Sequence, residues 1–318
     1  MAKKRTTTKK KPIRKKPGKK TNLGKLSIGL LLVVIFGYGA IAIWEGKIDT
    51  SFLNNDENSE VQNETPESKS DAKVTPNSNK RDLESFDLYF AKAFDFAWPS
   101  YSTDQAIIER PYFTIRYNEK HEQADWVAYQ LFADSLKLPK FDRKDNFRKD
   151  SRVKTESASL ADYKGSGFDR GHLAPAADFS YSEYTLSQSF FMSNISPQTP
   201  SFNRGVWKGL EEQIRDWAIE NEHLYVVTGP VLNKDFETIG PNKVSVPEMF
   251  YKIVLDIDKP GIKAIAFLMK NEKSGAELRS FTVTINEIEA LTGLDFFPSM
   301  SDELEDILES SIMTNEWF

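Results

Sequence analysis

The chain has 318 residues, a formal net charge of −5 and no cysteine, which excludes disulfides, thiolate metal sites and a cysteine nucleophile. Its length is sufficient for one large domain or two small ones with a sizeable core. The negative charge is concentrated beyond residue 81, where 25 Lys and Arg face 39 Asp and Glu. This acidic body argues against simple electrostatic adhesion to nucleic acid, so any phosphate-binding site must be a local basic patch.

The N-terminal 44 residues have the pattern of a membrane anchor. Residues 1–25 hold 12 Lys and Arg and no acid, and residues 26–44 form an uncharged, largely apolar stretch of 19 residues. A helix of about that length can cross a bilayer. The basic tail predicts a cytoplasmic N-terminus and an extracytoplasmic remainder, periplasmic or external. A cleaved secretion signal is the alternative, because residues 40–42 read Ala-Ile-Ala, but the long basic tail favours the anchor.

A polar segment separates this anchor from the rest of the chain. Residues 45–81 are rich in Asn, Ser, Glu, Asp, Lys and Thr, with few apolar residues and no periodicity. Such a composition predicts a disordered linker with a reach of roughly 30–40 Å. The pattern becomes globular at residue 82, so residues 82–318 are expected to form the functional domain.

Hydrophobic periodicity places the main elements of this domain. Strands are expected at residues 113–117, 126–132, 224–227, 250–257 and 263–269, and helices at residues 203–221, 286–291 and 302–312. A polar hairpin loop joins the first two strands. Because the strands do not alternate regularly with helices, we expect an α+β fold with a mostly antiparallel central sheet and flanking helices.

A basic segment follows the second strand. Residues 137–154 contain eight Lys and Arg against three Asp. Such a run is usually a solvated loop. Here it lies shortly before the motif described next, which favours a surface that faces phosphate groups.

Only one of the three histidines lies in a chemically suggestive context. His121 falls in the polar hairpin loop, where a solvated role is expected, and His223 lies before a strand, where a structural role is expected. His172 belongs to the sequence Gly-Phe-Asp-Arg-Gly-His-Leu-Ala-Pro. Arg170 and His172 are two residues apart, so both point to the same side of an extended segment. A neutral imidazole can take a proton from water, and a guanidinium beside it can hold a phosphate oxygen.

A second group of polar residues follows within about forty positions. Asn203, Trp207, Glu211 and Arg215 are spaced by four, which on one helix predicts a drifting polar stripe. An amide, a carboxylate and a guanidinium on one face can arrange a hydrated Mg²⁺ ion and a phosphate. The ordinary alternative for Glu211 and Arg215 is a surface ion pair of a few tenths of a kcal/mol.

These motifs together resemble the DNA/RNA non-specific endonuclease family, of which endonuclease G is a member. The residues that carry the resemblance are Asp-Arg-Gly-His at 169–172, the Ser-Asn-Ile-Ser-Pro-Gln segment at 193–198, and Asn203 followed by Glu211 and Arg215. The resemblance extends from about residue 126 to residue 298. It implies a catalytic core of the ββα-metal kind.

The resemblance also implies a role for each residue. His172 would be the general base that activates water, and Asn203 the sole direct protein ligand of Mg²⁺, with Mn²⁺ as the alternative ion. Glu211 would hold a metal-bound water. Arg170 and Arg215 would stabilise the charge that develops on the phosphate, and Asn194 would support either the base or the finger of the catalytic core. A further basic residue at the substrate would be Arg143 or Arg148, between which the sequence does not choose.

The expected activity is therefore metal-dependent hydrolysis of phosphodiester bonds in DNA, RNA or both, without sequence preference. A catalytically inactive, membrane-tethered nucleic-acid-binding module and an envelope interaction module are the alternatives. The absence of Gly-x-Ser-x-Gly and His-Glu-x-x-His sequences argues against a serine hydrolase and a zinc hydrolase. The sequence leaves open whether the domain forms a homodimer and whether an inhibitor protein binds it.

Overall fold

The computed structural model describes residues 97–100, 106–258 and 261–318. The predicted basic tail, anchor and linker, at residues 1–25, 26–44 and 45–81, lie outside the described residues. Within the described part of the chain, no helix combines the length and the apolar character needed to cross a membrane.

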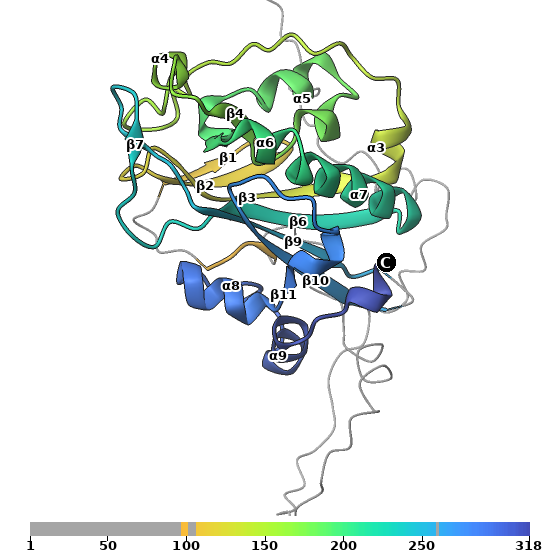
Figure 1. The fold of residues 1–318 in the computed structure, drawn as a ribbon. Helices are drawn as coiled ribbons and strands as arrows, with labels where there is room; N and C mark the ends of the chain where they lie inside the picture. The colour runs from red at the N-terminus through yellow and green to blue at the C-terminus, as the bar shows by residue number, and fades with distance from the viewer. Residues whose placement is uncertain (1–96, 101–105, 259–260) are drawn as a thin grey trace, which may run out of the picture. The chain divides into compact units, whose positions relative to one another are not determined.

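The described residues are built around one seven-stranded sheet, in which every neighbouring pair of strands is antiparallel (Figure 1). The spatial order is β1-β2-β3-β6-β9-β10-β11. The strands are β1 (Ala106–Glu109), β2 (Phe113–Asn118), β3 (Gln123–Phe132), β6 (His223–Pro230), β9 (Met249–Asp256), β10 (Lys263–Lys270) and β11 (Thr282–Val283). This arrangement confirms the α+β fold and the antiparallel sheet, and it confirms all five predicted strands.

Helices cover both faces of the sheet, which explains why its central strands are apolar on both sides. One face carries α3 (Ala133–Lys137), α4 (Leu160–Tyr163), α5 (Glu183–Gln188), α6 (Pro200–Asn203) and α7 (Val206–Glu220). The other face carries α8 (Ile285–Thr292) and α9 (Asp302–Ser310) (Figure 1). Alternate residues of β6 and β9 enter the two cores: Val226 and Val254 pack on the α7 side, and Val227 and Ile253 pack on the α8 side.

Two short ribbons lie outside the main sheet. Strand β4 (Asp169–His172) pairs with β5 (Ile195–Gln198), and β7 (Thr238–Ile239) pairs with β8 (Val244–Ser245). The Asp-Arg-Gly-His motif is therefore one strand of a two-stranded ribbon, and α6 follows the other strand almost directly.

The predicted helix over residues 203–221 is confirmed for residues 206–220 and is wrong in predicting one continuous helix through residues 204–205. The chain forms two helices, α6 and α7, separated at Gly205, whose φ of −108° and ψ of −114° are not helical. A Cβ atom at Gly205 would lie 2.3 Å from the Ser201 carbonyl oxygen, so the close approach there requires glycine. The two C-terminal helices are confirmed, with α8 one residue longer at each end and α9 ending at Ser310.

The predicted solvated role of His121 is also wrong. The hairpin loop is shorter than expected because β3 begins at Gln123, and His121 is only 4% exposed. Its Nδ1 lies 2.9 Å from the hydroxyl of Ser245 on β8, and its ring packs edge-on against Phe236. The local polarity of the loop did not indicate that the β7–β8 ribbon covers it.

Candidate active site

The β4–β5 ribbon places the motif histidine at the edge of a cleft. Register pairs Arg170 with Pro197, Gly171 with Ser196 and His172 with Ile195. A Cβ atom on Gly171 would lie 2.1 Å from the Oε1 atom of Gln198, so glycine permits the ribbon to pass this buried side chain.

His172 is held in an aromatic enclosure. Its ring packs against Phe147 and Phe190, with centroids 5.5 and 5.0 Å away, and only 8% of the residue is exposed. Among the described residues, its buried Nε2 atom has no hydrogen-bond partner. Burial, followed by the positive charges of Arg143 and Arg170, lowers the pKa of the imidazole to about 3. His172 is therefore neutral at physiological pH and able to accept a proton.

Asn194 holds the backbone of the two residues that follow His172. Its side-chain amide accepts from the Ala174 N–H and donates to the Ala174 carbonyl, each at 2.9 Å, and it also donates to the Ser189 carbonyl at 2.9 Å. The Leu173 N–H donates to the backbone carbonyl of Asn194 at 3.0 Å. Asn194 is fully buried and does not line the cleft, so its contacts are those of a positioning residue.

Asn203 is oriented by the aspartate of the motif. Its Nδ2 atom donates to Asp169 Oδ2 at 2.9 Å, which leaves the amide oxygen as the atom that can bind a cation. The Asp169 carboxylate also accepts from Arg204 Nε at 2.8 Å and Nη2 at 2.6 Å. The hydrogen bonds from Arg204 and Asn203 outweigh the effect of burial and lower the pKa of Asp169.

Glu211 reaches the same cleft from α7, one helix later than Asn203. Burial raises its pKa to about 7, and the negative charge of Asp178 acts in the same direction, whereas Lys252 and Arg215 lower it. The predicted stripe on one helix is correct for Glu211 and Arg215 but wrong for Asn203, which lies on α6, and for Trp207, which is fully buried in the core. Gly205 interrupts the helix, and the Trp207 ring packs against Phe250 of the sheet.

A buried charge cluster beneath Glu211 was not predicted. Arg215 donates to Asp178 Oδ1 at 2.8 Å, and the Tyr129 hydroxyl donates to Asp178 Oδ2 at 3.1 Å. Lys252 on β9 is fully buried, and burial lowers its pKa while the charges of Glu211 and Asp178 raise it. The sequence feature that could have indicated this cluster was the single lysine within the apolar strand at residues 250–257. No periodicity relates that lysine to the Asp-Arg-Gly-His motif.

The structure separates the two arginines that the sequence left as alternatives. Arg143 lines the cleft, forms an ion pair with Asp145 and has its guanidinium 5.1 Å from the Phe190 ring. Arg148 does not line the cleft. It donates to the Ser187 carbonyl at 2.8 Å, and its guanidinium stacks 3.7 Å above another ring, that of Phe191.

The cleft has a volume of about 570 Å³ and gathers most of the predicted site residues. It is lined by Arg143, Asp145, Phe147, Asp169, Arg170, His172, Pro175, Ala176, Ala177, Asn203, Arg204, Lys208, Glu211 and Arg215. Five basic residues thus face three acidic ones, which is the local basic patch that an acidic body requires for phosphate binding.

The donors in the cleft suit a hydrated divalent cation. The Asn203 amide oxygen and the Glu211 carboxylate are hard oxygen ligands, and Mg²⁺ retains several waters and needs few protein ligands. A neutral base, an oxygen site for a cation and several guanidinium groups within one cleft can activate water and neutralise a phosphate.

Comparison with known proteins agrees with this chemistry. The sequence profile described as DNA/RNA non-specific endonuclease matches residues 94–303, which is more than half of the chain. The chain is 33% identical over 221 residues to a nuclease of Nostoc sp., covering 66% of this chain and 79% of that protein. It is 33% identical over 205 residues to mitochondrial endonuclease G of Homo sapiens, covering 60% and 69%.

A fungal relative and a solved structure extend the similarity. Nuclease C1 of Cunninghamella echinulata is 35% identical over 214 residues, covering 62% of this chain and 85% of that protein. A chain in the crystal structure of the EndoG/EndoGI complex superimposes with a TM-score of 0.62 at 26% identity, covering 68% of this chain and 94% of that one.

Proposed function

The chain belongs to the DNA/RNA non-specific endonuclease family, and from that premise we propose that it is a metal-dependent endonuclease that hydrolyses phosphodiester bonds of DNA, RNA or both. One observation carries the proposal. The cleft brings a neutral, buried His172 together with Asn203 and Glu211 from a different part of the chain. A binding module without turnover has no need of this combination.

His172 acts as the general base. Its imidazole, which lines the cleft, takes a proton from the water that attacks phosphorus, a contribution of about 10²–10⁴ in rate. The low pKa of the free imidazole weakens it as a base. The negative charge of a bound phosphodiester raises that pKa, because it offsets Arg143 and Arg170.

Asn203 and Glu211 would hold the metal, with Asn203 as the direct ligand and Glu211 holding water next to it. Mg²⁺, or Mn²⁺ in its place, would supply Lewis-acid stabilisation of the phosphate and of the leaving oxygen. Asp169 contributes by fixing the Asn203 amide with its oxygen free. The β4–β5 ribbon followed by α6 and α7 is the arrangement that we assign as the ββα-metal core.

The arginines provide positive charge where the transition state develops negative charge. Arg170 and Arg215 line the cleft near His172 and Glu211, and Asp178 holds Arg215 in one orientation. Arg143 is the substrate-binding arginine that we choose over Arg148. Contacts restricted to phosphates carry no base readout, so the enzyme is expected to cut without sequence preference.

The cellular setting that we propose rests on the sequence alone. The uncharged stretch at residues 26–44, preceded by a basic tail, supports a membrane tether with the catalytic domain on the extracytoplasmic side. The similar EndoG chain was solved in a complex with EndoGI, in which EndoG is inhibited. This likeness supports the proposal that an inhibitor protein also binds this chain.

The test uses the purified full-length chain with supercoiled plasmid and with total RNA, in Mg²⁺, in Mn²⁺ and in EDTA. Cleavage should require the metal and should be lost in His172→Ala. His223→Ala is the matched control, because that imidazole stacks on Phe132 and bonds Gln130, away from the cleft. A folded parent that binds but does not cut either substrate in any metal would support the inactive binding module instead.

A further inference from the structure

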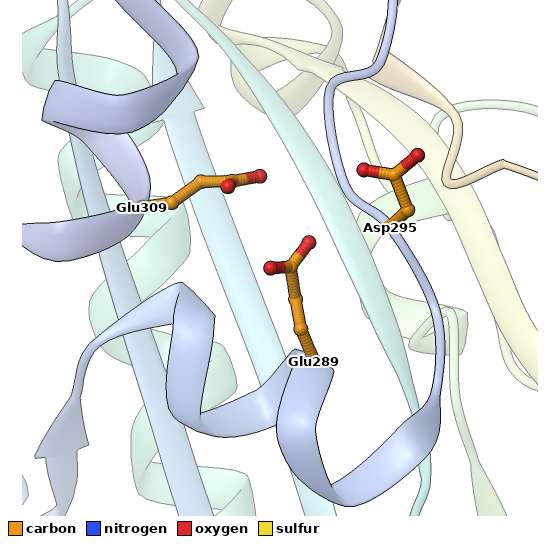
Figure 2. Close-up of side chains that lie close together, drawn as sticks. All are labelled: Glu289, Asp295 and Glu309. Atoms are coloured by element: carbon orange, nitrogen blue, oxygen red, sulfur yellow. The ribbon is translucent and has the colours of Figure 1, made fainter.

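Three acidic side chains converge on the face of the sheet opposite to the cleft. Glu289 lies on α8, Asp295 on the loop that follows it and Glu309 on α9, and Figure 2 shows their carboxylates turned toward one another. One oxygen of each lies within 4.8 Å of the other two. None of these residues lines the cleft that contains His172.

The cluster lacks basic partners within the described residues. In the described parts of the chain, no Lys or Arg forms an ion pair with Glu289, Asp295 or Glu309. Glu305 adds a fourth carboxyl group nearby, and burial followed by the neighbouring acids raises its pKa to about 7. Carboxylates that share a site without a counterion repel one another, so the arrangement is unfavourable unless a cation or a proton enters.

Glu309 gives an independent indication of a ligand. It is only 7% exposed, and within the described residues its buried Oε1 atom has no hydrogen-bond partner. Its side chain extends from α9 into the centre of the cluster (Figure 2). A buried acceptor without a partner is costly, and its cost is removed when it coordinates a cation.

We infer that Glu289, Asp295 and Glu309 form a calcium-binding site that is separate from the catalytic centre. Ca²⁺ binds oxygen ligands at about 2.3–2.6 Å, so oxygens on opposite sides of the ion are about 4.6–5.2 Å apart. The three oxygens lie within 4.8 Å of one another, which is close enough for one such ion to bind all three. Mg²⁺ demands a near-octahedral geometry and keeps several of its waters, so it is usually bound through one or two carboxylates rather than by a cage of three.

The site would link separate elements on this face of the sheet. It connects α8 to α9 through one ion, and the backbone carbonyl of Asp295 accepts from Ser100 N–H at 2.7 Å, which ties in the segment at residues 97–100. Calcium should therefore stabilise this layer without taking part in the chemistry at His172.

The test measures calcium binding by titration calorimetry and the melting temperature with and without CaCl₂. It uses the full-length chain carrying Asn203→Ala, so that binding at the catalytic cleft is reduced. Glu309→Gln and Asp295→Asn are compared with Glu303→Gln, a control at an exposed acid on the same helix. Each variant is also tested for Mg²⁺-dependent nuclease activity in the chain with Asn203 intact.

The parent should bind one Ca²⁺ with a dissociation constant of about 10⁻⁵–10⁻³ M, and its melting temperature should rise by about 5 °C at saturation. Glu309→Gln and Asp295→Asn should lose one binding event and most of the shift, whereas Glu303→Gln should keep both. Without calcium, Glu309→Gln should melt no lower than the parent, because the substitution removes repulsion. Nuclease activity should be unchanged in all three.

Two results would overturn the inference. The parent could show no calcium binding at 100-fold the upper dissociation constant, in which case the carboxyl groups share a proton instead. Alternatively, Glu309→Gln and Asp295→Asn could retain the full calcium response, which would place the ion elsewhere. Because the readouts are binding and melting, both results are independent of whether the cleft cuts nucleic acid.

Discussion

Lys252 Nζ lies 3.3 Å from the carbonyl oxygen of Leu173, the residue that directly follows His172. The ammonium group is fully buried and lies 4.9 Å from the centre of the Trp207 ring. It thereby connects the middle of the sheet to the Asp-Arg-Gly-His motif, and its charge acts on Glu211. A residue that touches neither substrate nor metal thus influences two parts of the proposed catalytic site.

Replacing Lys252 should move the pH dependence of cleavage. Glu211 acts in its ionised form and has a pKa of about 7, so activity should fall as the pH drops through 7. Lys252 lowers that pKa, and Lys252→Met should therefore raise it and shift the acid limb of kcat/KM to higher pH. The measurement is a pH profile at saturating Mg²⁺.

Lys263→Met is the control for that profile, because Lys263 lies on β10 next to Asp256 and away from the cleft. Its acid limb should coincide with that of the parent. An unshifted limb in Lys252→Met, with the protein folded, would show that Lys252 does not act through Glu211.

Arg143→Ala should mainly lower activity, whereas Arg148→Ala should mainly lower stability. Arg143 is 53% exposed at the cleft, so its loss should lower kcat/KM by about 10–100-fold and reduce the slope of log kcat/KM against log salt by about 1, with little change in stability. Arg148→Ala removes a stacking contact and a hydrogen bond to Ser187, so it should cost about 1–2 kcal/mol of stability. Equal losses of activity in both variants would contradict the choice of Arg143.

Asn194→Leu should impair both folding and turnover. The change removes three hydrogen bonds and leaves the polar groups of Ala174 and Ser189 buried, so we expect a loss of about 2–4 kcal/mol in the free energy of unfolding. The urea midpoint measures this. The value of kcat should fall while the Mg²⁺ concentration for half-maximal activity stays constant, because Asn203 is untouched.

Asn146→Ala is the matched control, since its amide makes one exposed hydrogen bond to Ser187. It should change stability by less than about 0.5 kcal/mol. A weaker Mg²⁺ dependence in Asn194→Leu would mean that Asn194 serves the metal rather than the chain around His172.

Gly171→Ala tests the close packing of the β4–β5 ribbon. The new methyl group would overlap the buried end of Gln198, so we expect about 1–3 kcal/mol of destabilisation and a displaced His172 with reduced activity. The double variant Gly171→Ala with Gln198→Ala should recover part of both losses, because the space for the methyl group is restored.

Gly209→Ala in α7 is the control, because a methyl group there should stabilise the protein rather than destabilise it. A Cβ atom there meets nothing within 4 Å, so the substitution should stabilise the helix by about 0.5–1 kcal/mol. If Gly171→Ala were as stable and active as the parent, the ribbon would have room that the structure does not indicate.

Local patterns in the sequence determined the elements and the type of site. Alternating and continuous apolar runs gave the positions of five strands, because a strand in this sheet buries one or both faces along its own length. The residue types at 169–172, 203 and 211 indicated a proton acceptor and oxygen groups suited to a hydrated cation, and the resemblance to the family implied the individual role of each residue. The family relationship confirms the class of protein that these motifs indicated.

Only the tertiary structure decided which residues share an environment. The position of Arg143 at the cleft and of Arg148 away from it, the burial of His121 and the position of Lys252 beneath the motif all depend on contacts between segments far apart in the chain. Periodicity reports which side of an element is apolar but does not report which element covers it. The same limit hid the convergence of Glu289, Asp295 and Glu309, because each of these acids is unexceptional in its own helix or loop.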